Sequence, residues 1–423
     1  MPSWTPTGEM LDFFEKQVTE RFVRYVQIAT TADPDSGAIP SSASQWDLLR
    51  CLEVELRALE IADASLSEKA CVYGTLPANK PGVVPFTLIS HVDTSPEVSG
   101  KGVKPVLHEK YDGGVIRFPD NPELTLSPDN CPALNGMIGD TVITASGTTL
   151  LGADDKAGVA VIMALLATFR KFPEASHGEI RVCFTSDEEI GAGASRIDLT
   201  RLSKLCYTMD GGEVGELESE SFDAHKAVID FKGRVTHPGT AFGVMISAID
   251  AAASFVARLP QDQKPERTKD RLGFFYTVSI TGSCSDAKVV LIIRDFDPAK
   301  NQERIKFLHD LASKMQSEQP GLEVNVQATA QYPNMAQFIR STPEVVDLAR
   351  EAILSAGIKP IETPIRGGTD GSILSSFGHP CPNIFTGQHM IHSLTEWTSV
   401  GSLVKSGEVL MRLAERYVSE TAR

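Results

Sequence analysis

Three short apolar runs in the first half of the chain each lead directly into acidic or histidine side chains. The runs cover Val83–Ser90, Glu179–Thr185 and Leu205–Met209. Apolar residues follow one another in them almost without alternation, which is typical of strands covered on both faces in a parallel sheet. Helical apolar spacing at Leu11–Ile28 and Ala157–Phe169 supplies the helices of βαβ units. The pattern therefore predicts an α/β domain built on a parallel sheet.

The residues that follow these runs are suited to binding a cation. His91 and Asp93 follow the first run, Glu188 and Glu189 follow the second, and Asp210 follows the third. In open α/β sheets, ligands bind beyond the carboxyl ends of the strands. The sequence therefore predicts a functional site at this edge of the sheet.

A different pattern begins after Ser221 and ends near Asn334. We expect the order strand, helix, strand, strand, helix, strand, which is the split βαβ arrangement of ferredoxin-like domains. These elements are predicted at Ala227–Phe231, Val244–Ala257, Phe274–Ile280, Val289–Arg294, Ala299–Met315 and Leu322–Ala328. The α/β pattern then resumes, with helices at Val345–Ala356 and Leu403–Val418 and a strand near Asn383–Thr386. The predicted organisation is a discontinuous α/β domain, residues 1–221 and 334–423, with residues 222–333 inserted as a second domain.

The composition restricts the classes of partner. The 40 Lys and Arg residues against 55 Asp and Glu residues give a net charge of −15, which repels phosphate backbones and anionic bilayers, so we expect no nucleic-acid and no membrane partner. The 7 cysteines are odd in number and widely spaced without a CxxC pair, which argues against a disulfide framework and a thiolate zinc site. The first residues lack a signal-peptide pattern, and no apolar run reaches the ~20 residues of a membrane span. We therefore expect a cytoplasmic protein.

Five segments carry the residue types that a hydrolytic two-metal site needs. They read SHVDTS, LLGADDKAG, TSDEEIGAG, YTMDGG and GQHMIHS. Zinc and similar metals take imidazole and carboxylate ligands, and two neighbouring cations need a bridging carboxylate and a separate base for the attacking water. Each segment alone fits a helix cap or a turn equally well. The metal interpretation depends on all five falling at strand ends of one α/β frame.

The chain resembles the peptidase T family of tripeptide aminopeptidases through the ordered motifs SHVDT, LLGADDKAG, DEEIGAG, YTMDGGEVGEL, THPGTA, IIRDFD, IRGGTDGS and CPNIFTG. That family belongs to a clan of di-zinc peptidases which also includes carboxypeptidases, dipeptidases and aminoacylases. The resemblance extends at least from His91 to Glu396. It implies a discontinuous zinc-binding catalytic domain with an inserted lid or dimerisation domain.

The resemblance implies ligands for two zinc ions. His91 and Asp210 would hold one ion, Glu189 and His392 would hold the other, and Asp154 would bridge both. The neighbouring His389 offers a competing imidazole, but the spacing from His392 to Glu396 fits the family pattern.

The resemblance also implies two residues that serve the reaction. Glu188 would be the general base for the metal-bound water and would pass the proton to the leaving amine. Asp93 would lie behind His91 and fix its tautomer and orientation. The peptide bond between Asp154 and Asp155 would be unusual, a cis bond being one possibility. The alternative, a helix N-terminus that favours two carboxylates, explains Glu188 but not the histidines at strand ends.

Four further residues resemble substrate contacts of the family. His237, in THPGTA, resembles a histidine that stabilises the tetrahedral oxyanion, and Arg294 and Arg366 resemble arginines that bind substrate carboxylate or carbonyl groups. Asn334 is a further substrate-contact candidate. For Arg294, an ordinary salt bridge to Asp295 or Asp297 explains the residue equally well.

The chain departs from the family pattern at two places. Phe242 and Val244 occupy positions after HPGTA where the family often carries lysine, and residues 388–391 replace aromatic residues and glycine. These changes leave the implied metal ligands intact and put a strict preference for tripeptides in question.

Three functions compete. The first is a zinc aminopeptidase acting on short peptides, with Glu213 or Glu216 as candidates for binding the free amino terminus. The second is a carboxypeptidase or deacylase of the same clan. The third is a metal-stabilised binding protein without turnover, which would have no use for Glu188.

Because the inserted domain has an edge strand, and edges are usually covered, we expect a homodimer formed through this domain.

Overall fold

The computed structural model describes residues 4–421 and divides the chain into two compact units. Unit 1 contains the described chain up to Ser219, then Gln337–Thr363, and the chain from Thr369 onward. Unit 2 contains Glu220–Ala336 and Pro364–Gly368. The domain limits expected from the sequence, at 221/222 and 333/334, stay predictions.

Unit 1 is built on a seven-stranded sheet. In spatial order its strands are β1 (Ser65–Leu66), β2 (Val72–Leu76), β8 (Ile180–Thr185), β3 (Phe86–His91), β9 (Leu205–Gly211), β15 (Asn383–Phe385) and β10 (Leu217–Glu218). The four central strands are parallel, with Leu88 opposite Val182 and Tyr207. The predicted parallel sheet is confirmed for this centre, whereas β1, β2 and β10 pair antiparallel at the flanks. Because β2 runs antiparallel to β8 and β3 runs parallel to it, β2 and β3 point in opposite directions. Their connection therefore needs no crossover helix and contains none.

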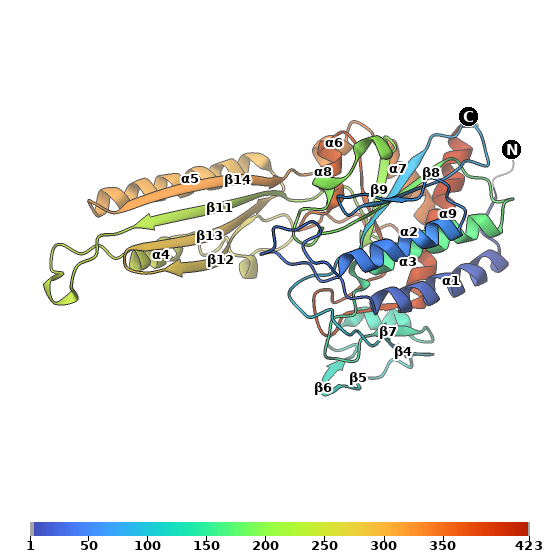
Figure 1. The fold of residues 1–423 in the computed structure, drawn as a ribbon, viewed down its shortest axis with the longest axis horizontal. Helices are drawn as coiled ribbons and strands as arrows, with labels where there is room; N and C mark the ends of the chain where they lie inside the picture. The colour runs from blue at the N-terminus through green and yellow to red at the C-terminus, as the bar shows by residue number, and fades with distance from the viewer. Residues whose placement is uncertain (1–3, 422–423) are drawn as a thin grey trace. The chain divides into compact units, whose positions relative to one another are not determined.

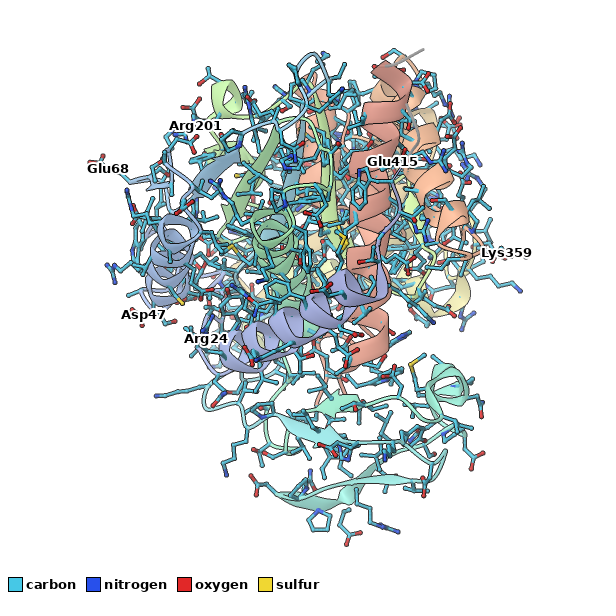
Figure 2. All side chains as sticks on the ribbon, turned by 90° about the vertical axis from the view of Figure 1, so that its right-hand side faces the viewer. Arg24, Asp47, Glu68, Arg201, Lys359 and Glu415 are labelled. Atoms are coloured by element: carbon cyan, nitrogen blue, oxygen red, sulfur yellow. The ribbon has the colours of Figure 1, made fainter. Side chains whose placement is uncertain are left out.

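Helices cover the sheet of unit 1 (Figure 1). They are α1 (Gly8–Val26), α2 (Gln45–Ala58), α3 (Ala153–Lys171), α7 (Glu344–Ser355), α8 (Asp370–Ser376) and α9 (Val400–Thr421). Helix α3 packs on β3 and β9, and α1 and α9 pack on α3 in turn. Its buried stretch runs from Ala153 to Phe169 because it has protein on every side. Figure 2 shows the side chains of this unit, with Arg24 near the end of α1 and Glu415 on α9.

Residues 101–149 form short strands and loops. Strands β4 (Val106–His108) and β7 (Val142–Thr144) join β16 (Trp397–Ser399) in a three-stranded sheet, and β5 (Ile116–Phe118) pairs with β6 (Asn121–Leu126). A 3₁₀ helix follows at Pro132–Met137. Their shared core is centred on the fully buried Trp397.

Unit 2 has the predicted ferredoxin-like order of elements. These are β11 (Asp223–Lys232), α4 (Ala248–Ala257), β12 (Phe274–Gly282), β13 (Asp286–Asp295), α5 (Pro298–Glu318) and β14 (Glu323–Tyr332). The antiparallel sheet has the order β12-β13-β11-β14, and both helices contact it. Phe231, Phe255 and Leu308 lie in the core between helices and sheet. A short helix, α6 (Ala336–Ile339), follows β14.

All 7 cysteines are free thiols, and Cys183 and Cys206 are buried. Within residues 4–421, no helix combines the length and the apolar character needed to cross a membrane.

Candidate metal centre

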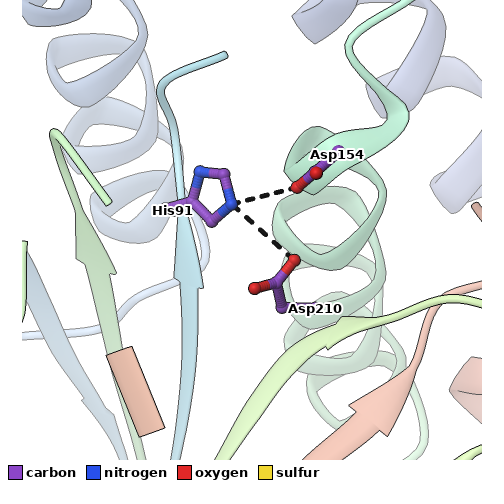
Figure 3. A group of neighbouring side chains, drawn as sticks. All are labelled: His91, Asp154 and Asp210. Carbon is purple, nitrogen blue, oxygen red and sulfur yellow. Dashed lines mark hydrogen bonds and ion pairs between the residues drawn. The ribbon is translucent and has the colours of Figure 1, made fainter. Parts of the chain in front are cut away.

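Three side chains meet at the carboxyl ends of the central strands (Figure 3). His91 is the last residue of β3, Asp210 lies near the end of β9, and Asp154 lies in the first turn of α3. Nε2 of His91 is 3.1 Å from Oδ1 of Asp154 and 3.7 Å from Oδ1 of Asp210. We call these three residues the inner group.

A second group shares Asp154. Nε2 of His392 is 3.2 Å from Oδ2 of Asp154 and 3.1 Å from Oε2 of Glu189. Asp154, Glu189 and His392 are called the outer group. In each group one donor atom per residue lies within 4.8 Å of the others. The two oxygens of Asp154 therefore face one histidine each, as a bridging carboxylate would.

The donor set fits a pair of divalent cations. Each group supplies one imidazole and two carboxylates, which is the ligand chemistry that zinc accepts. Oε1 of Glu189 is buried and has no hydrogen-bond partner among the described residues. A buried polar atom without a partner is costly, and a cation would satisfy it.

Asp93 contacts both His91 and the acidic loop, which is the loop after β8 that carries Glu188 and Glu189. Nδ1 of His91 lies 3.0 Å from the backbone oxygen of Asp93 and 3.4 Å from its Oδ1. The same carboxylate accepts the backbone N–H groups of Glu188 and Glu189 at 3.1 Å each. Asp93 thus lies behind His91, where the sequence places it, and also anchors the loop that carries the two glutamates.

Two further aspartates hold the ends of that loop. Asp187, in the left-handed region at φ 61°, accepts a hydrogen bond from Nε2 of Gln45 at 2.6 Å. Asp370 accepts from Oγ1 of Thr185 and from the backbone N–H of Ala194, both at 2.8 Å. The loop is therefore fixed on both sides of its glutamates.

The Asp154–Asp155 peptide bond is cis, which is one of the possibilities that the resemblance implied.

Burial and crowding of charge dominate the electrostatics of the centre. Burial, and then the charge of Asp154, raise the pKa of Asp210 to about 6 and that of Glu189 to about 8. Burial opposes charge on His392, but hydrogen bonds to Asp154 and Glu189 raise its pKa to about 11. Burial also opposes charge on Asp154, yet the two histidines lower its pKa. Ionised carboxylates this close repel one another, and divalent cations between them remove the repulsion.

Glu188 lies half-buried among other charged groups. Burial raises the pKa of its carboxyl well above the usual value, and the charges of Asp210, Asp370 and Glu189 add to the shift, opposed by His91. A carboxyl group with a raised pKa can take a proton from water near neutral pH.

The competing histidine is not part of either group. The ring of His389 stacks on Trp397 at a centroid distance of 4.2 Å, and burial lowers its pKa to about 4. Its neighbour Gln388 instead donates from Nε2 to the backbone oxygen of Asp210 at 3.1 Å. Of the two histidines, His392 is the one that the fold brings to Asp154.

The four predicted substrate contacts lie in unit 2, where two of them are engaged internally. Asn334 is buried, accepts the N–H of Ser221 and donates to the backbone oxygen of Phe296 at 2.9 Å. Nη1 of Arg366 donates to the backbone oxygens of Asp270 and Leu272 at 2.6 and 2.9 Å.

The other two are His237 and Arg294, and Nη1 of Arg294 donates to Oε1 of Gln331 at 3.2 Å. His237 is exposed, and its Nδ1 accepts only the N–H of Gly239, at 3.1 Å. The guanidinium of Arg294 lies 4.8 Å from the ring centroid of Tyr332. Asp295 pairs with Arg304 rather than with Arg294, so the salt bridge expected as an alternative is not formed with Asp295.

Sequence reasoning assigned no role to two residues that contact this centre. Oε2 of Glu97 lies 3.1 Å from Nδ1 of His392, and Glu396 contacts the loop before Asp154. The only signal for Glu97 was its place six residues after His91. Glu216, a candidate for binding an amino terminus, instead accepts the N–H groups of Gly212 and Glu213 in its own loop.

Comparison with known proteins agrees with this geometry. Residues 149–416 match the model of peptidase family M20/M25/M40. The peptidase T of Geobacillus thermodenitrificans is 42% identical over 410 residues, which cover 96% of this chain and 100% of the relative. The chain belongs to peptidase family M20/M25/M40.

Two solved structures share the fold. The aminopeptidase PepT of Bacillus cereus superposes with a TM-score of 0.74 at 23% identity, covering 96% of this chain and 99% of the other. A tripeptidase of Staphylococcus aureus gives a TM-score of 0.76 at 22% identity, with the same coverage of 96% and 99%. The α/β fold class predicted from the sequence is thereby confirmed, and this member of the family is a peptidase.

Proposed function

We propose that the chain is a two-zinc aminopeptidase that releases the amino-terminal residue from short peptides, tripeptides in particular. The observation that carries this proposal is the sharing of Asp154 by two groups of metal-binding side chains. Relatives named peptidase T and fold neighbours named aminopeptidase and tripeptidase support the choice of substrate. His91 and Asp210 would hold one cation, Glu189 and His392 would hold the other, and Asp154 would be shared by both.

Bound zinc would polarise the scissile carbonyl group and acidify a water molecule. Glu188 takes the proton of that water and delivers it to the leaving amine, which suits a carboxyl whose pKa burial and neighbouring charge raise. Asp93 supports both partners because it holds His91 and the backbone of Glu188 in place.

Substrate recognition and assembly are finer parts of the same proposal. His237 donates to the carbonyl oxygen as negative charge develops there, and Arg294 and Arg366 bind substrate carboxylate or carbonyl groups. Asn334 contributes a further substrate contact. The exposed Glu213 is the candidate for the substrate ammonium group.

The proposal includes a cytoplasmic homodimer formed through the inserted domain. Its β12 is an edge strand with Tyr276 and Val278 about half exposed, at 48% and 47%, and such an edge is usually covered. Light scattering at micromolar concentration should give twice the chain mass, and a monomer there would refute this part.

The general base is tested with Glu188→Gln. Removing the proton acceptor should lower kcat by about 10²- to 10⁴-fold on a tripeptide, while the zinc content per chain stays near that of the wild type. Glu68→Gln, at an exposed position in the same unit, is the control and should keep full activity. Substantial residual turnover in Glu188→Gln would contradict the assignment.

The substrate class is tested with a panel of peptides of graded length, read by mass spectrometry with and without a chelator. Tripeptides with a free amino terminus should lose that residue, and the chelator should stop the reaction. Cleavage of blocked peptides would instead favour a carboxypeptidase or deacylase. No cleavage by zinc-loaded protein would favour a metal-stabilised binding protein.

A further inference from the structure

A buried glutamate closes the loop that presents Asp154. Glu396 is only 1% exposed. Its Oε2 accepts the backbone N–H groups of Leu151 and Gly152, both at 2.8 Å, and its Oε1 accepts the N–H of Asp154 at 3.0 Å. One carboxylate therefore binds three N–H groups of four consecutive residues.

The backbone of this loop is shaped to receive an anion. Gly152 has φ 82° and ψ 32°, in the left-handed region, which turns neighbouring N–H groups toward one side. Such a concave set of N–H groups binds anions, and the side chain of Glu396 supplies the negative charge. A Cβ on residue 152 would meet Cγ2 of Thr94 at 3.3 Å, and the left-handed backbone there also favours glycine.

The contact also joins two parts of the centre that are far apart in the sequence. Glu396 directly precedes β16 and lies four residues after His392. It is separated from Asp154 by 242 residues. The loop that carries His392 and the loop that carries Asp154 are thus tied together by a side chain that is not itself in either metal group.

We infer that Glu396 is a positioning residue that orients Asp154 toward the inner and outer groups at once. This inference rests on the proposed two-metal function and adds to it the residue that sets the bridge. Because Asp154 is common to both groups, a change at Glu396 alters the binding of both cations. A purely structural cap on α3 would change the stability of the fold but not the affinity of folded protein for metal.

The test is Glu396→Gln in the full-length protein. The amide keeps the size of the side chain, but its NH₂ group cannot accept a hydrogen bond, so at least one of the three N–H groups loses its partner. The matched control is Glu415→Gln on α9 (Figure 2), a buried glutamate that accepts a hydrogen bond from Ser419. Zinc dissociation constants are measured by competition with a chromophoric chelator, and folding by circular dichroism.

For Glu396→Gln we expect both zinc dissociation constants to rise by about 10- to 100-fold, the usual effect of losing a partner that orients a metal ligand. At saturating zinc, kcat on a tripeptide should fall while KM stays within about twofold. Glu415→Gln should leave both constants unchanged. Zinc affinities of folded Glu396→Gln within twofold of wild type would overturn the inference, and so would a change in only one of the two constants.

A second variant guards against misfolding. Glu396→Asp keeps the charge but is one methylene too short to reach all three N–H groups, so both dissociation constants should again rise. Wild-type affinities in Glu396→Asp would overturn the inference. If the wild type binds two zinc ions and cleaves no peptide, the proposed function fails while the affinities still decide the role of Glu396.

Discussion

The inner and outer groups share a carboxylate but differ in how the chain holds them. The inner His91 and Asp210 belong to neighbouring buried strands, and their side chains are 3% and 12% exposed. The outer His392 lies in a loop, with φ 60° and a side chain 33% exposed. A ligand fixed by a sheet is already oriented, whereas a ligand on a loop must be ordered when it binds. The comparison indicates that the outer cation binds more weakly and exchanges faster.

The largest expected effect is at the residue that both groups share. In Asp154→Asn the bridging charge is lost, so we expect both cations to bind more weakly by more than about 100-fold, beyond the effect of an outer partner. Metal analysis after desalting should find less than one zinc per chain. His392→Ala is the companion variant and should keep one zinc, in the inner group. Two tightly bound zinc ions in Asp154→Asn would break the comparison.

The pH dependence of the metal-free protein separates the two groups. Asp210, with its pKa raised to about 6, and Glu189, raised to about 8, bind protons in the folded state that the unfolded chain releases. The stability of the metal-free protein should therefore fall as pH rises, because the folded state binds more protons than the unfolded state. His392, with its pKa raised to about 11, acts in the same direction above its usual pKa.

Thermal unfolding of chelator-treated protein between pH 5 and 9 checks this expectation. Asp210 contributes to this decline up to about pH 6, whereas Glu189 contributes up to about pH 8 and His392 contributes above its usual pKa. Above about pH 6 the contribution of the two groups therefore comes from the outer group. Glu189→Gln should reduce the decline up to about pH 8, including the part above pH 6 to which Asp210 does not contribute. Saturating zinc should reduce the whole decline. A melting temperature that rises across this range would contradict the assignment.

The smallest effect is expected at Glu97, which contacts only the outer group. Its Oε2 lies 3.1 Å from Nδ1 of His392, and its side chain is 63% exposed. Glu97→Gln should therefore weaken the outer zinc by about 10-fold, at the lower end for such partners, and leave the inner zinc unchanged. Stepwise zinc titration resolves the two constants. Equal weakening of both ions would remove the distinction between the groups.

The sequence predicted the parts of the centre that depend on strand ends. Apolar runs that stop at His91, Glu188 and Asp210 indicate buried parallel strands, and parallel strands bring their ends to one edge. The ferredoxin-like order of unit 2 could also be predicted, because its strand and helix patterns follow one another in that order along the chain. His392 follows the predicted strand near Asn383–Thr386, and the family resemblance chose it over His389 through its spacing to Glu396.

The rest depends on contacts between distant segments. Gln45 and Asp187 hold the acidic loop across 142 residues, and no local pattern relates them. Helix α2 was missed although its Gln45–Ala58 spacing is amphipathic, and the antiparallel flanks follow from which strands pair rather than from their composition. The donors of Asn334 and Arg366 bind backbone oxygens of their own unit, which residue type alone does not reveal. Their role as substrate contacts stays a prediction.

The order of residues along the chain has a consequence for biosynthesis. Unit 1 is interrupted by unit 2, and its last metal-binding side chain, His392, is translated after all of Glu220–Ala336. A ribosome-bound nascent chain therefore exposes the inner ligands before the outer histidine exists. An activity that needs both groups must therefore wait until almost the whole polypeptide has left the exit tunnel.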